Sequence, residues 1–223
     1  MTTANSSRRA DWLVPAGLIL LSVVPAIAGA ARLASLVNGA DVTAENARFF
    51  AAPLPVVLHI LSVIPFSILG ALQFTPALRR KRSAWHRTAG KYLIVLGMMT
   101  ALTGLWMTLS YPWPAGDGVG VYALRLVFGS AMAISIVLGV EAIRRRDFKR
   151  HGDWMTRGYA IGLGAGTQVL THLPYFILVG QPDEYSRTLM MGAGWVINVV
   201  VAEWVIRRAG VRRPARRSII ASH

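Results

Sequence analysis

The chain contains no cysteine among its 223 residues. This absence excludes a disulfide framework, a thiolate metal site and a cysteine nucleophile. Charged residues are also few: they make up 15% of the chain, whereas a soluble domain usually carries about a quarter. Hydrophobic residues make up 54%. A low share of charged residues together with a high share of hydrophobic residues is typical of an integral membrane protein.

Acidic residues are scarce as well, with 10 Asp and Glu against 24 Lys and Arg and a net charge of +14. Such an excess can indicate nucleic-acid binding. Here, however, the basic residues gather in short clusters between apolar runs of roughly 20 residues, the length that crosses a bilayer as a helix. We therefore expect no nucleic acid as a partner and attribute the charge to membrane topology.

The apolar runs predict an all-α fold, an integral membrane protein with six transmembrane helices. The predicted spans are Trp12–Ala34, Pro53–Leu78, Gly90–Tyr111, Val119–Ile143, Trp154–Val179 and Thr188–Ile206. The first run is expected to be a retained helix, because no clear small-residue cleavage pattern follows it. The chain then divides into a cytoplasmic segment (1–11), a transmembrane domain (12–206) and a basic cytoplasmic tail (207–223).

With six spans, 20 of the 24 Lys and Arg lie on one side of the membrane. The positive-inside rule places that side, with both termini, in the cytoplasm, and predicts a multi-pass protein of the cell inner (cytoplasmic) membrane. The same charge is expected to attract anionic lipids at the cytoplasmic face. Four arginines lie elsewhere: Arg32, Arg48, Arg125 and Arg187.

An internal repeat is visible when the second and third spans are laid over the fourth and fifth. Each unit has a polar group in its first span, a basic connection, and a histidine followed by a tyrosine. His59 and His86 are 27 residues apart, and Arg125 and His151 are 26 apart. The repeat predicts a four-helix core over about 53–180, built from two repeated helical hairpins.

Four histidines fall into two pairs of equal predicted depth. His59 and His172 each lie about six or seven residues inside the outer end of a span, roughly 10 Å deep. His86 and His151 each open a span at the inner face. A b-type haem takes two axial imidazoles from different helices. This arrangement therefore predicts one or two b-type haems (haem b), each ligated by one of these histidine pairs. Such a protein would be a transmembrane electron-transfer or redox protein.

Arginines near the two pairs are the candidate partners of haem propionates: Arg125 near the outer face, and Arg87 and Arg157 near the inner face. A quinone or another small molecule is a candidate electron donor. A homodimer is a candidate assembly.

Other functions use the same residues. Membrane histidines often only form hydrogen bonds between helices. A small transporter or accessory protein without a cofactor would use Arg125 as an anion site, and a purely structural protein would use the basic motifs as helix anchors. No catalytic residue is assigned, because the sequence has no closely spaced pair of metal ligands such as His-x-x-x-His.

Two motifs carry a resemblance to a known family. They are His86-Arg87-x-x-Gly90-x-Tyr92, preceded by Gly70-x-x-Gln73, and His151-x-x-Trp154-Met155-x-Arg157-x-Tyr159-Ala160. Over about residues 53–180 the chain resembles a bacterial family of predicted membrane proteins, domain of unknown function 2306, although Gly152 stands where that family often has a basic residue. The resemblance implies a membrane protein and brings no established activity. In architecture, the paired-histidine core is also similar to the ascorbate-reducible b-type cytochromes and the copper-resistance-type di-haem proteins, which implies haem.

Overall fold

A computed structural model of the chain describes residues 3–75, 78 and 83–211. Within these residues the chain is helical and has no strand, which confirms the all-α prediction. The helices are α1 (Thr3–Val37), α2 (Ala47–Ala51), α3 (Pro53–Gln73), α5 (Ser83–Ser110), α6 (Val119–Arg144), α7 (Phe148–Gly162), α8 (Gly164–Leu178) and α9 (Glu184–Val211). Arg79 to Arg82 of the second connection and most of the predicted tail (212–223) lie outside the described residues.

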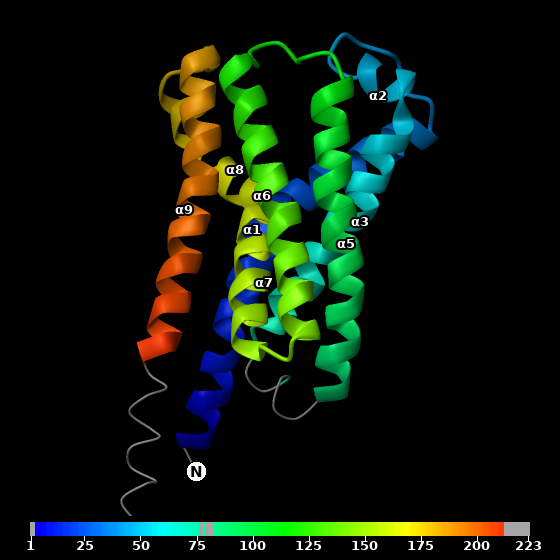
Figure 1. Cartoon of the computed structure of the whole chain (residues 1–223). Coiled ribbons are helices and arrows are strands. Elements are labelled where there is room, and N and C mark those ends of the chain that lie inside the picture. Colours follow the sequence, from blue (N-terminus) through cyan, green and yellow to red (C-terminus); the bar gives the residue numbers. More distant parts are fainter. Residues whose placement is uncertain (1–2, 76–77, 79–82, 212–223) are drawn as a thin grey trace, which may run out of the picture.

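In the part of the chain that is described, five helices are long and apolar enough to cross a membrane. They are Trp12–Val37, Pro53–Gln73, Ala84–Ser110, Val119–Arg144 and Glu184–Ala209. Their ends lie within a few residues of five predicted spans. In Figure 1 these helices form one bundle, and the start of α1 and the end of α9 both lie at its lower end.

The sixth span is not confirmed as a continuous helix. The structure divides the predicted span 154–179 into α7 and α8, which are 15 residues long each and meet at Leu163. Leu163 has φ −78° and ψ 0°, which ends the regular α-helical geometry of α7. α7 packs on α6 and α9, whereas α8 packs on α9 and α1. The apolar run therefore folds as two helices with different neighbours.

Polar side chains of α8 and α9 compensate the break. The side-chain amide of Asn198 on α9 donates a hydrogen bond of 3.0 Å to the carbonyl of Ala160 on α7. The hydroxyl of Thr167 donates to Asn198 Oδ1 at 2.6 Å and so orients that amide. The Leu163 carbonyl accepts from the N–H of Gly166 at 3.0 Å. Backbone groups in an apolar environment need partners within the protein. Two of these contacts supply such partners, and the contact between Thr167 and Asn198 supports one of them.

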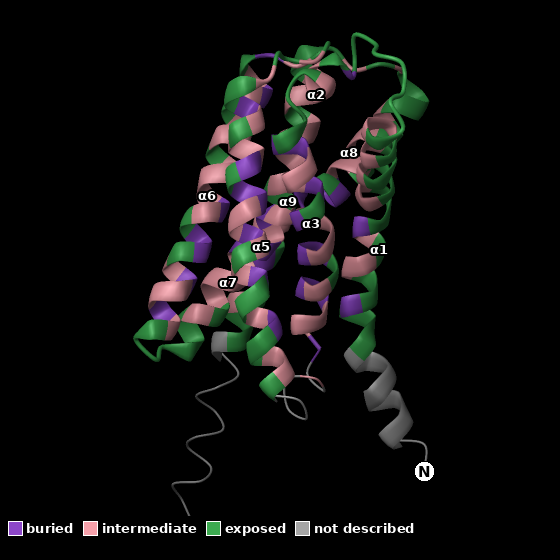
Figure 2. Cartoon of the chain, turned by 90° about the vertical axis from the view of Figure 1, so that its right-hand side faces the viewer, coloured by how far each residue is buried: buried purple, intermediate pink, exposed green. Residues whose placement is uncertain are grey.

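Glycines around the break let other elements approach closely. A Cβ on Gly166 would lie 2.3 Å from the carbonyl oxygen of Leu21 on α1, and one on Gly162 would lie 2.7 Å from the Phe66 ring. Gly97 of α5 would meet the same ring at 2.7 Å. The ring of Phe66, 2% exposed, therefore lies in a slot between α5 and α7 at the centre of the core. Figure 2 shows the buried residues on the inward sides of the helices.

The two predicted hairpins, α3 with α5 and α6 with α7, both pack internally, but the repeated core is not confirmed. α5 is continuous where its counterpart is broken. The paired tyrosines also differ: Tyr92 is 64% exposed, whereas Tyr159 is 6% exposed and donates a hydrogen bond to the Ser67 carbonyl. The environments of the two motifs are therefore not equivalent.

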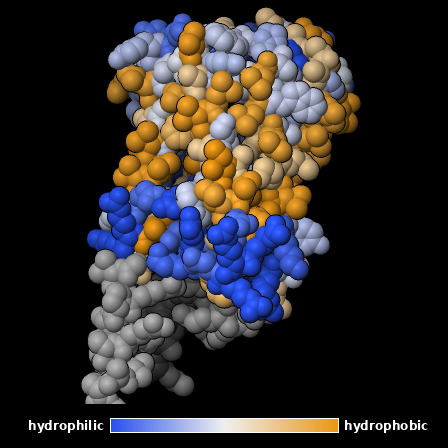
Figure 3. All heavy atoms as spheres, in the orientation of Figure 1, coloured by the Kyte–Doolittle hydropathy of each residue, from blue (hydrophilic) through white to orange (hydrophobic). Residues whose placement is uncertain are grey.

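The two ends of the bundle carry different charge. We call the end with the start of α5, the α6–α7 connection and the end of α9 the basic end; its described cations are Arg87, Lys91, Arg144, Arg145, Arg146, Lys149, Arg150, Arg207 and Arg208. Figure 3 shows its hydrophilic band below an apolar surface. The opposite end holds α2 and the connections 111–118 and 179–183, and we call it the cavity end.

Gly166→Ala is expected to lower the free energy of unfolding by about 1–3 kcal/mol, because the new methyl group would overpack against the backbone of α1. Unfolding by dodecyl sulfate in mixed micelles, followed by circular dichroism, measures the change. Gly17→Ala is the matched control: a Cβ there meets nothing within 4 Å, so alanine's higher helix propensity leaves stability equal or higher. Equal effects of the two variants would contradict the close α1–α8 contact.

Candidate functional site

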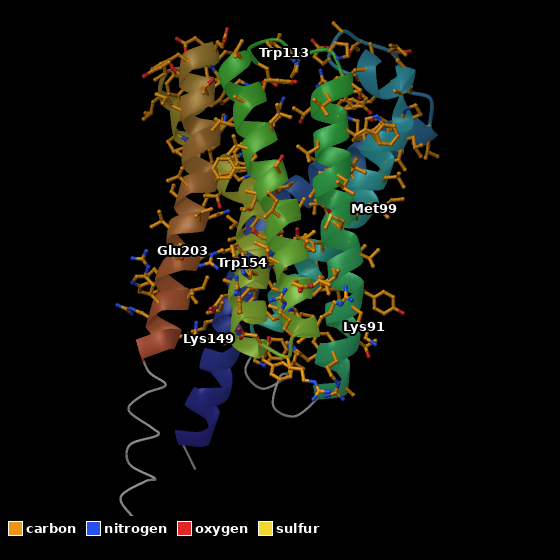
Figure 4. The ribbon with its side chains drawn as sticks, in the orientation of Figure 1. Lys91, Met99, Trp113, Lys149, Trp154 and Glu203 are labelled. Atoms are coloured by element: carbon orange, nitrogen blue, oxygen red, sulfur yellow. The ribbon has the colours of Figure 1, made fainter. Side chains whose placement is uncertain are left out.

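A cavity of about 390 Å³ extends from the connection 111–118 at the cavity end to the α7–α8 break. That volume lies within the range of small-molecule sites. Its aromatic and glycine lining includes Phe49, Trp113, Phe128, Trp195, Gly104, Gly129 and Gly162. Its polar lining includes Arg48, His59, Thr100, Thr108, Tyr111, Tyr122, Arg125 and Gln168. Figure 4 labels Trp113 at this end of the bundle.

His59 on α3 is held by α5 where it lines this cavity. Its Nδ1 lies 3.1 Å from the carbonyl of Thr100 and 3.1 Å from the hydroxyl of Thr103. A carbonyl oxygen only accepts, so Nδ1 carries the proton and Nε2 of the neutral ring has a free lone pair. A Cβ on Gly104 would lie 3.5 Å from the ring, so glycine gives the imidazole room at this point.

Two other histidines share this arrangement. Nδ1 of His151 on α7 donates to the carbonyl of Gly139 on α6 at 2.8 Å. Nδ1 of His172 donates to the carbonyl of Gln168, one turn earlier on α8, at 2.7 Å. A hydrogen bond that fixes Nδ1–H and leaves Nε2 available is the second-shell pattern of ligating histidines. The sequence pattern of the histidines does not predict this shared feature.

The structure brings some predicted site residues together and separates others. His59 and Arg125 line one cavity. His172 is not among its described lining residues, although its hydrogen-bond partner Gln168 is. His86, in the first turn of α5, and His151 both lie at the basic end. Whether each predicted pair shares a ligand stays a prediction.

The two inner arginines lie away from the cavity. Arg157 on α7 forms a bidentate ion pair with Glu203 on α9, at 2.5 and 3.1 Å, and its guanidinium lies 4.6 Å from the Trp154 ring centroid. Figure 4 shows Trp154 and Glu203 at a similar height on neighbouring helices. Arg87 is exposed at the basic end. The ion pair of Arg157 with Glu203 therefore joins α7 to α9.

Arg125 belongs to a charged cluster at the cavity end. Its Nη1 lies 2.6 Å from Oδ2 of Asp117, and Nε of Arg187 lies 2.5 Å from Oδ1 of the same carboxylate. The Asp117 side chain is only 2% exposed. The Asp117 carboxylate therefore joins the connection 111–118 to α6 and α9. It holds the guanidinium groups of Arg125 and Arg187 close to each other.

Arg32 and Arg48 lie on the ring of Phe49, with their guanidinium carbons 4.6 and 4.5 Å from its centroid. Burial lowers the pKa of Arg48, and the nearby charges of Arg32 and Arg125 lower it further, whereas Asp117 opposes this. The four arginines that depart from the positive-inside pattern thus gather at the cavity end, beside the connection 111–118. We call this part of the cavity its mouth. No group of three or more His, Asp or Glu residues suited to a metal ion occurs within the described residues.

Comparison with known proteins gives a family and nothing closer. The model of the predicted membrane protein family DUF2306 matches residues 56–206. The chain belongs to this family. No curated protein and no solved structure matches it.

The DUF2306 match confirms the family resemblance expected from the two motifs. It spans α3 to α9 and includes the four candidate haem histidines, Arg125 and Asp117. It does not include α1 and α2, which supply Arg32 and Arg48. With five long apolar helices, membership shows a predicted membrane protein with several transmembrane helices. The likeness to di-haem cytochromes stays a prediction.

Arg48 and Gln168 line the cavity and Asp117 binds Arg125, but the sequence alone did not predict a role for these three residues. For Arg48 a signal was present, because it is one of the four arginines outside the basic clusters. Asp117 lies in a turn-rich connection, where a carboxylate is ordinary. Its burial depends on Arg125 and Arg187, which are 8 and 70 residues further along the chain.

Asp117→Asn is expected to lower the free energy of unfolding by about 2 kcal/mol, because it leaves two partly buried arginines without their carboxylate. Thermal or dodecyl sulfate unfolding in neutral detergent measures the loss. Asp41→Asn, at an exposed position of the same end, is the control and leaves stability unchanged. An equal response of the two variants would show that the carboxylate of Asp117 does not hold the cavity end together.

Proposed function

We propose that this protein is a transmembrane redox protein whose cavity binds haem b, with His59 as an axial ligand. The observation that carries the proposal is the hydrogen bond from His59 Nδ1 to the Thr100 carbonyl. It fixes the tautomer and leaves Nε2 for iron on a residue that lines the cavity. On α8, His172 would supply the second imidazole, and its Nδ1 is fixed in the same way.

The other lining residues suit a flat apolar group with acidic edges. Aromatic rings and glycines line the body of the cavity, and Arg48 and Arg125 lie toward its mouth. A bound haem would supply one-electron transfer, and burial together with the hydrogen-bonded imidazole would set its potential. His86 and His151, with Arg87 nearby, are the proposed ligands of a second haem near the basic end.

We further propose that α7 and α8 together form the sixth crossing, as one interrupted span. This gives six spans and places the end of α9 and the start of α1 on the same side. By the positive-inside rule the basic end is cytoplasmic, in the cytoplasmic membrane. Its cations would contact anionic lipids. A quinone or another small molecule as electron donor follows from the redox function. A homodimer is a further proposal, which also suits the transporter described below.

The full chain, produced with haem available and purified in detergent, is expected to show Soret and α bands in a reduced-minus-oxidised spectrum. His59→Ala should remove at least half of the bound haem, because it deletes the axial ligand of the cavity site. Absorbance of the pyridine complex gives the haem content per chain. His223→Ala, outside the described residues, is the control and should retain all of it. A wild-type protein without these bands would overturn the haem proposal.

A second candidate is a small transporter, which the break between α7 and α8 favours. Transporters often line their midplane sites with interrupted helices, and Ile161, Gly162 and Ala165 beside the break line this cavity. Here Arg125 would bind an anionic substrate and no cofactor would be needed. His59→Ala would then leave transport intact, while Arg125→Ala would abolish it.

The absence of cysteine makes the two candidates separable by labelling. In oriented membrane vesicles, Ala165→Cys is expected to react with a membrane-impermeant maleimide from one side only, because a resident haem site has one fixed opening. Ala40→Cys, in an exposed position at the cavity end, marks that side. Reaction of Ala165→Cys from both sides would instead favour a transporter with alternating access.

A further inference from the structure

The lining of the cavity contains more positive than negative charge. Arg48 and Arg125 both line the cavity, and no Asp or Glu is among its described lining residues. Buried and half-buried cations outside water are costly unless an anion or strong acceptor compensates them. The charges around the guanidinium groups of Arg48 and Arg125 therefore indicate which kind of ligand the cavity would bind.

Asp117 cannot compensate both arginines of the lining. One of its oxygens faces Arg125 and the other accepts from Arg187, which is outside the lining. The side chain of Arg125 is still 31% exposed, and a guanidinium has five N–H donors, of which Asp117 engages the Nη1 side. Arg125 thus keeps donors for a second anion.

Arg48 is the less compensated of the two. Its guanidinium lies over the Phe49 ring, and Arg32 lies on that ring as well. Burial lowers the pKa of Arg48, and the charges of Arg32 and Arg125 lower it further. An anion in the mouth would compensate the buried charge of Arg48 and offset the repulsion from Arg32 and Arg125.

We infer that the ligand of this cavity carries an oxyanion group, a carboxylate or a phosphate, and that Arg48 and Arg125 recognise this group. The apolar body of an amphipathic ligand would then enter the cavity. Arg–oxyanion contacts are charge-assisted and geometrically selective. This inference rests on one part of the proposed function, namely that the cavity binds a ligand. It applies equally to haem propionates, a lipid phosphate or a free anion.

The first test compares haemin with its dimethyl ester, in which the two propionates are uncharged, in titrations of the haem-free full-length protein. Wild type is expected to bind haemin at least about tenfold more tightly, the size of one charge-assisted contact. Arg48→Gln and Arg125→Gln should each lose that preference. Arg32→Gln, a neighbour outside the lining, should keep it. Equal binding of haemin and ester by wild type would overturn the inference.

The second test covers the case in which neither porphyrin binds, which would end the haem proposal alone. Thermal unfolding of the same protein is measured with dodecyl phosphate, inorganic phosphate and neutral dodecyl maltoside. A rise in midpoint with dodecyl phosphate only indicates an amphipathic anion, and an equal rise with inorganic phosphate indicates a free anion. Loss of the rise in Arg48→Gln but not in Arg32→Gln supports the inference. No rise with either phosphate, or a rise that Arg48→Gln retains, overturns it.

Discussion

Polar groups at membrane depth must find their partners within the protein, and this requirement governs the centre of the molecule. The chain meets it at Leu163, where α7 gives way to α8. Asn198 binds the Ala160 carbonyl and Thr167 holds the amide in place. Without these contacts the interruption would expose backbone groups to an apolar environment. With them, α8 can turn toward α1 and α9 while α7 stays against α6.

The cavity lies beside this change of direction. Residues on both sides of the break, Gly162 and Ala165 among them, form its inner lining. Its other walls come from α2, α3, α5, α6, α9 and the connection 111–118. Close packing elsewhere allows the opening: Phe66 fills the slot between Gly97 and Gly162, and Gly166 lies against the backbone of α1. The imidazole of His59 enters the cavity from α3 with its tautomer set by α5.

The basic residues form two kinds of arrangement, one at the exposed basic end and one around the cavity. The many cations of the basic end are exposed and concern the orientation of the whole chain. The four remaining arginines are instead organised locally, two by Asp117 and two by the ring of Phe49. Because two of them line the cavity, the local arrangement bears on ligand choice rather than topology. The ion pair of Arg157 with Glu203 has a third role, in joining α7 to α9.

The sequence by itself determined the membrane class, five of the spans and the position of the basic end, since hydropathy and charge are properties of contiguous residues. The family motifs were also readable, because they are local. Tertiary structure decided the rest. The break lies in an apolar run with no proline near Leu163, and its compensation comes from Asn198 on another helix. The two halves of the repeat matched in charge and spacing, yet packing gave Tyr92 and Tyr159 different environments. The cavity mouth depends on α1, α2, α6 and α9 meeting at one end, and only the packed fold brings those distant residues together.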